Sequence, residues 1–160
     1  MYLKLKCLAM DEIIGKLKTP EECRQFIVKY SDLVRQARQR AIELRASAHQ
    51  AQDVVDYELL QALYAYEDIL SEKNSRKTRA NRTWQMVKHY GIKVAAERAV
   101  NRKVDAMGYK VLVGMGLQGL TFESVIVKFP DSFSPEAVKQ AHKRLEELKK
   151  ELEPTLWPFV

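Results

Sequence analysis

The chain has 160 residues, of which 46% are hydrophobic and 30% charged, and its formal net charge is +6. This length allows one well-buried core, and the composition is globular rather than disordered. No run approaches the roughly 18 apolar residues of a membrane span, the first residues lack a secretory signal pattern, and Cys7 and Cys23 have no CxxC spacing. We therefore expect a small cytoplasmic protein of bacterial type, with reduced cysteines and no membrane partner.

The positive charge is concentrated in one quarter of the chain. Residues 73–110 contain 11 Lys and Arg against 2 Asp and Glu, a net charge of +9, whereas residues 1–72 carry −2 and residues 111–160 carry −1. A solvated helix surface normally mixes both signs, because like charges repel one another and oppose folding. The segment reflects either solubility alone or an acidic partner, for which nucleic acid is the first candidate.

Helix signals begin near the N-terminus, where residues 10–14 resemble the first ordered turn. Thr19 can cap a helix that enters through Pro20, with a glutamate three residues after the cap. This pattern directs four side chains inward, those of Cys23, Phe26, Ile27 and Tyr30. Whether translation begins at Met1 or Met10 stays open.

Two longer helices are predicted next. Ser31 and Asp32 can cap a helix whose apolar residues recur at spacings of three and four, namely Leu33, Ala37, Ala41, Leu44 and Ala48. The arginines on its outer face are expected to be solvated or paired with acids; they are Arg35, Arg38, Arg40 and Arg45. A further helix at about 53–72 is apolar over more than half of its circumference, so we expect it to be central in the fold.

The segment 73–81 has no apolar stripe and is predicted to be an exposed basic linker. Thr83 can cap a helix that ends at Gly91, and another helix begins at Ile92. Because Gly91 directly separates them, the two helices form a short hairpin.

The last third of the chain is less regular. Residues 104–129 favour two short helices, with a β-hairpin as the alternative. Ser134 and Pro135 open an amphipathic C-terminal helix, and the apolar tail at 154–160 is expected to dock.

Gly114, Gly116 and Gly119 match the GxGxxG pattern of dinucleotide sites. Such a site also needs a helix of about ten residues after the last glycine, which holds the pyrophosphate at its N-terminus, and then a second strand. The next strand-like run begins at Val125, six residues after Gly119, so no crossover helix fits. The glycines are therefore predicted to mark a helix–helix turn with close backbone approach, and no cofactor is expected.

Residues 83–102 resemble a helix-turn-helix, in which the second helix enters the major groove of DNA. With Gly91 at the turn, usually apolar positions fall on Met86, Tyr90, Ile92 and Val100. Val87 and Glu97 depart from the pattern, since a small and an apolar residue are usual there. In this arrangement the DNA side would carry Lys93, Ala96, Glu97 and Arg98. An ordinary core hairpin is the alternative.

Neither a metal site nor a catalytic group is indicated. The three histidines are far apart in sequence, and none has a partner at a ligand spacing. No GxSxG motif occurs, and no paired acids stand on an apolar face. We therefore name no catalytic residue, no metal ligand and no cofactor.

These patterns predict an all-α fold, a small helical bundle of about six to seven helices. The expected organisation is an N-terminal helical hairpin bundle at 10–72, the basic linker at 73–82 and a C-terminal helix-turn-helix-like half at 83–153. One compact domain is the alternative.

The predicted function is nucleic-acid binding, with DNA as the first candidate, through phosphate contacts from the segment 73–110. The alternatives are a helical protein–protein interaction module without a nucleic-acid role and, third, an enzyme subunit. Sequence preference and oligomeric state stay open. The predicted phosphate-binding residues are Arg76, Lys77, Arg79, Arg82, Lys88, Lys93, Arg98, Arg102 and Lys103.

Overall fold

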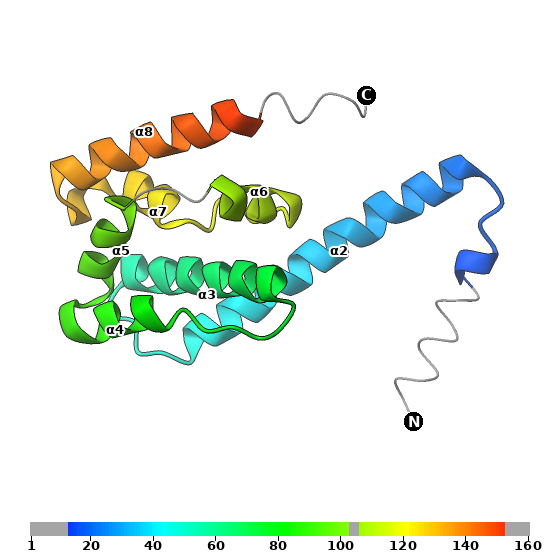
Figure 1. Cartoon of the computed structure of the whole chain (residues 1–160). Coiled ribbons are helices and arrows are strands. Elements are labelled where there is room, and N and C mark those ends of the chain that lie inside the picture. The colour runs from blue at the N-terminus through cyan, green and yellow to red at the C-terminus, as the bar shows by residue number, and fades with distance from the viewer. Residues whose placement is uncertain (1–12, 103–105, 153–160) are drawn as a thin grey trace. The chain divides into compact units, whose positions relative to one another are not determined.

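The computed structural model describes residues 13–102 and 106–152 (Figure 1). Every regular element among them is a helix, so the predicted all-α bundle is confirmed. The predictions for the start of the first ordered turn at residues 10–12, for Lys103 and for the tail at 154–160 lie outside the described residues. None of the described helices is both long enough and apolar enough to cross a membrane.

Seven α-helices have both ends assigned within the described residues, in agreement with the six to seven expected. They are α2 (Pro20–Ser47), α3 (Val54–Asn74), α4 (Asn81–Tyr90), α5 (Ile92–Val100), α6 (Ala106–Gly114), α7 (Phe122–Lys128) and α8 (Pro135–Leu152), with a short 3-10 turn, η1 (Pro130–Ser132), before α8. The chain divides into two compact units, Met1–Arg38 and Gln39–Val160, and the division falls inside α2. The second unit contains segments from both sides of the basic linker.

The start of α2 is a capping box, as the sequence predicts. The Oγ1 of Thr19 accepts a hydrogen bond from the Glu22 amide at 3.1 Å, and the Glu22 carboxylate accepts one from the Thr19 amide at 3.1 Å. Two of the amides that a helix start leaves unpaired are thereby satisfied.

Two predictions for α2 are wrong. The helix does not restart at Ser31, because Asp32 accepts side-chain hydrogen bonds from Arg35 and Gln36 on the helix surface instead of capping. The side chains expected inward are not buried: Cys23 is exposed and Ile27 is 62% exposed. The pairing expected for the arginines is confirmed for three of them, in the ion pairs Arg35–Asp32, Arg40–Glu43 and Arg45–Asp68.

Helix α3 is the centre of the second unit, as its apolar circumference predicts. Asp53 caps it by accepting a hydrogen bond from the Asp56 amide at 2.8 Å, and Leu59 and Leu63 are fully buried. Figure 1 shows α4 on one side of α3 and the pair α6–α7 on the other, with α8 beyond that pair. Helix α5 crosses one end of these layers and contacts α3, α4, α7 and α8.

The C-terminal part contains the two short helices, α6 and α7, that the sequence favours over a hairpin. The glycine motif is a turn between them, and Gly116 has a positive φ of 69°. The expected close backbone approach is wrong for Gly114 and Gly119, since a Cβ on either would meet nothing within 4 Å. Ser134 caps α8 by accepting a hydrogen bond from the Ala137 amide, as predicted.

Candidate nucleic-acid interface

The basic linker is fastened to α3 by one buried carboxylate. Glu67, only 9% exposed, accepts two hydrogen bonds at the same oxygen, from the Ala80 amide at 3.0 Å and from the Trp84 Nε1 at 2.7 Å. One turn further along α3, the hydroxyl of Ser71 accepts a hydrogen bond from the Thr78 amide at 2.9 Å. The loop that carries Arg76, Lys77 and Arg79 is therefore held at both its middle and its end.

An aromatic cluster lies beside this loop. The rings of His49 and Trp84 stack with centroids 5.2 Å apart, and His49 Nε2 lies 2.5 Å from the Tyr64 hydroxyl. Burial raises the pKa of Tyr64, and the negative charge of Glu67 adds to that shift. Arg79 lies over the Trp84 ring at 5.2 Å, and it makes no ion pair with a carboxylate of the described residues.

Two arginines, Arg98 in α5 and Arg102 directly after it, lie against α4. Arg98 stands over the Tyr90 ring at 3.8 Å, and the Nη2 of Arg102 lies 3.4 Å from the sulfur of Met86. Met86 and Tyr90 are four residues apart, which places them on one side of α4. Arg82 precedes Met86 by four residues and continues the same row on α4.

Seven of the nine predicted residues form what we call the basic surface: Arg76, Lys77, Arg79, Arg82, Lys88, Arg98 and Arg102. All seven are exposed, and none makes an ion pair with a carboxylate of the described residues. Within the described part of 73–102 the only acidic residue is Glu97, whose carboxylate accepts a hydrogen bond from the Ser134 amide at 2.7 Å. The described residues therefore supply no ion-pair partner to this surface.

Lys93 does not belong to the basic surface. Its ammonium lies 2.5 Å from the Asp53 carboxylate and 3.7 Å from that of Asp56. The hydrogen bond raises the pKa of Lys93 and, together with the cap amide of Asp56, lowers the pKa of Asp53. The charge of Lys93 is thus matched inside the protein. Lys103, the ninth predicted residue, lies outside the described residues.

The side of α5 that a helix-turn-helix would present to DNA is not exposed as a unit. Ala96 is fully buried, Glu97 is bonded to the start of α8, and Lys93 is paired with the cap of α3. Of the four residues expected there, only Arg98 is exposed, because α5 is enclosed by α3, α7 and α8. Tyr90, expected at an apolar core position, is 51% exposed. These placements correct the expectations for Lys93, Ala96, Glu97 and Tyr90.

Sequence reasoning missed the residues that hold the arginines in place. Tyr90 and Met86 were assigned to a core, and Glu67 was one acid among several on α3. The available signal was the shared spacing of four in Met86–Tyr90 and Arg98–Arg102 across a one-residue turn at Gly91. The bonds of Glu67 to residues 13 and 17 positions away leave no such local pattern.

Comparisons of this chain with protein-family models, with curated proteins and with solved structures found no match in any of the three. The function is therefore inferred from the chain's own chemistry.

Proposed function

We propose that the protein binds nucleic acid through phosphate contacts made by the basic surface. The observation that carries this proposal is seven exposed Lys and Arg side chains that make no ion pair with a carboxylate of the described residues. They lie on the loop between α3 and α4, on α4 and α5, and directly after α5. Unbalanced cations on an ordered surface release counterions when they meet phosphates, which favours binding. Phosphate contacts carry no base information, so we expect affinity with little sequence preference.

A salt-titrated binding assay tests this proposal. Fluorescence anisotropy of the full chain would be measured against duplex DNA, single-stranded DNA and RNA of matched length at 50 to 200 mM salt. We expect log affinity to fall linearly with log salt, by about 0.9 for each phosphate neutralised on duplex DNA. If no nucleic acid binds at the lowest salt, the basic surface has another purpose.

Self-association through α2 is a second candidate function, and one observation in the first unit supports it. Ile27, Leu33 and Val34 are 62%, 51% and 52% exposed and share one side of the helix with Phe26 and Tyr30. Monomeric proteins seldom leave such a row of apolar side chains in water. A second copy of the helix would cover it.

Sedimentation velocity over a range of concentrations tests the second candidate. The double variant Ile27→Glu/Val34→Glu should remove a concentration-dependent dimer. Val28→Glu is the matched control, because Val28 is 72% exposed but lies on another side of the helix. A wild-type protein that is monomeric throughout, or a dimer equally sensitive to Val28→Glu, argues against this candidate.

A further inference from the structure

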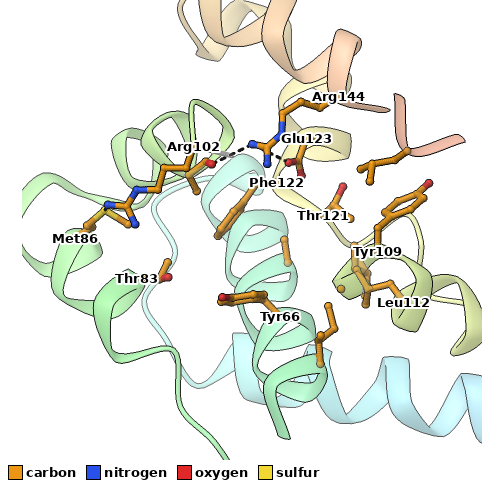
Figure 2. A pocket seen from close by; sticks show the side chains of 16 residues that line it. Tyr66, Thr83, Met86, Arg102, Tyr109, Leu112, Thr121, Phe122, Glu123 and Arg144 are labelled. Carbon is orange, nitrogen blue, oxygen red and sulfur yellow. Dashed lines mark hydrogen bonds and ion pairs between the residues drawn. The ribbon is translucent and has the colours of Figure 1, made fainter. Parts of the chain in front are cut away.

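The six helices α3 to α8 surround a cavity of about 240 Å³. Figure 2 shows Arg144 and Glu123 at one end, Tyr66 at the other, and Tyr109 with Leu112 along one side. The cavity opens to solvent beside Tyr66, which is 40% exposed, and its volume equals that of roughly eight liquid waters at ~30 Å³ each. The cavity is large enough for a small organic molecule.

Most of the cavity wall is apolar. Its hydrophobic lining comes from every surrounding helix and includes Ile69, Met86, Leu112, Leu120, Phe122 and Leu148. Hydroxyl groups are supplied by Thr83, Thr121 and two tyrosines. A lining of this kind, apolar with a few polar groups, is typical of small-molecule sites.

The charged end of the cavity has an incompletely paired arginine. Arg144 is 5% exposed; its Nη1 donates hydrogen bonds to the backbone carbonyls of Ala99 and Val100 and lies 3.3 Å from the Glu123 carboxylate. The Nε of Arg144 is buried without an acceptor, and no group of the described residues pairs with Nη2. Nε is closed off from the cavity, which leaves Nη2 as the nitrogen that can donate a charge-assisted hydrogen bond to a carboxylate.

The charge of the cavity favours a single negative charge. Among the described lining residues, Arg144 and Arg102 are cationic and Glu123 is the only acid, which gives a net charge of +1. A buried cation without full pairing is costly, and a monoanion would offset that cost. A doubly charged phosphate would instead leave an excess negative charge beside Glu123.

We propose that this cavity binds a small monocarboxylic acid. The carboxylate is held by the Nη2 of Arg144, and the apolar body lies among Ile69, Leu112 and Leu120. The proposal does not depend on nucleic-acid binding, since six of the seven residues of the basic surface lie outside the cavity lining.

Isothermal titration calorimetry of the full chain with octanoate tests the proposal, with 1-octanol and octylammonium as neutral and cationic probes of the same length. We expect one octanoate per chain and at least about tenfold weaker binding of 1-octanol, because the alcohol lacks the charge-assisted hydrogen bonds. Octylammonium should not bind. Equal affinity for octanoate and 1-octanol, or no binding of octanoate at millimolar concentration, would overturn the proposal.

Two variants locate the site without removing Arg144, whose loss could unfold the protein. Glu123→Gln removes the competing negative charge, so octanoate should bind several-fold more tightly while 1-octanol does not change. Glu146→Gln on the exposed side of α8 is the matched control and should change neither. Ala99→Leu fills the cavity and should abolish binding, with the fold checked by circular dichroism. Unchanged octanoate affinity in Glu123→Gln would place the ligand elsewhere and overturn the assignment.

Discussion

The guanidinium of Arg98 lies over the ring of Tyr90, with its central carbon 3.8 Å from the ring centroid. Four residues further along the chain, Arg102 donates a hydrogen bond to the sulfur of Met86 at 3.4 Å. These contacts hold long cationic side chains near one conformation, which reduces the side-chain entropy lost when a phosphate binds.

Replacing Tyr90 tests whether this ordering contributes to affinity. Tyr90→Ala removes the ring and should weaken nucleic-acid binding by roughly two- to fivefold, the size of an exposed cation–π contact. Tyr90→Phe keeps the ring and should bind as wild type does. Fluorescence anisotropy at fixed salt measures both, and equal losses in the two variants would assign the effect to the hydroxyl.

Charge reversal on the basic surface should weaken binding to all sequences alike. In Arg79→Glu/Arg82→Glu the slope of log affinity against log salt should flatten by about 0.9 for each lost contact on duplex DNA. Both side chains are exposed and neither makes an ion pair with a described residue, so the loss of stability should not exceed that of the Arg79–Trp84 contact, about 0.5 to 1 kcal/mol.

Lys93→Gln is the matched control for that experiment. Lys93 lies in the same basic stretch but is neutralised by Asp53 and Asp56, so its removal should leave the salt slope unchanged. A slope that flattens equally in Lys93→Gln would show that local sequence charge, and not the unpaired surface, determines binding.

We expect Glu67 to be essential for holding the basic linker against α3. Glu67→Leu leaves the Ala80 amide and the Trp84 indole without their acceptor, at about 1 to 3 kcal/mol for each group that stays buried. Glu67→Gln keeps an acceptor oxygen and should cost less. Urea denaturation gives both free energies of unfolding, and equal stability of Glu67→Leu and wild type would contradict the anchoring role.

The ion pair between Asp53 and Lys93 predicts a pH window for stability. The pKa of Asp53 is lowered in the folded protein. The stability that Asp53 contributes is therefore complete above the pKa of an unfolded Asp, about 3.9, and is lost as the pH falls through the folded pKa. The pKa of Lys93 is raised in the folded protein. The stability that Lys93 contributes is therefore complete below the pKa of an unfolded Lys, about 10.4, and is lost as the pH rises through the folded pKa.

The difference in melting temperature between wild type and Lys93→Met should therefore be largest between about pH 4 and pH 10 and shrink on both sides. Thermal denaturation at a series of pH values measures this difference. A difference that stays constant through pH 3 would mean that the pair does not stabilise the fold.

Local sequence signals predicted a helix start correctly where the candidate capping residue accepts a hydrogen bond from a backbone amide of the first turn. Thr19 and Ser134 each accept the amide three residues on, as their patterns indicate. Asp32 has the same chemistry but lies inside α2, where it bonds Arg35 and Gln36. A capping residue has only a weak preference for a helix end, and here the helix continues through it.

The basic residues of the candidate site were predictable from charge alone, but their pairing was not. Lys93 meets Asp53 forty positions away, and this contact depends on the packing of α5 against α3. The same applies to Ala96, whose burial follows from the helices around α5. Sequence spacing identifies neighbours within one helix and does not identify those brought together by the tertiary fold.

Because of the hydrogen bond from Trp84 to Glu67, the fluorescence of Trp84 can report the position of the basic linker. The chain has two tryptophans, Trp84 and Trp157, so Trp157→Phe would leave a single indole emitter. That emitter is bonded to the carboxylate that anchors the loop and stacked beside Arg79. Its emission wavelength and quenching would report, without an added dye, when the loop leaves α3 or when Arg79 is drawn towards a bound phosphate.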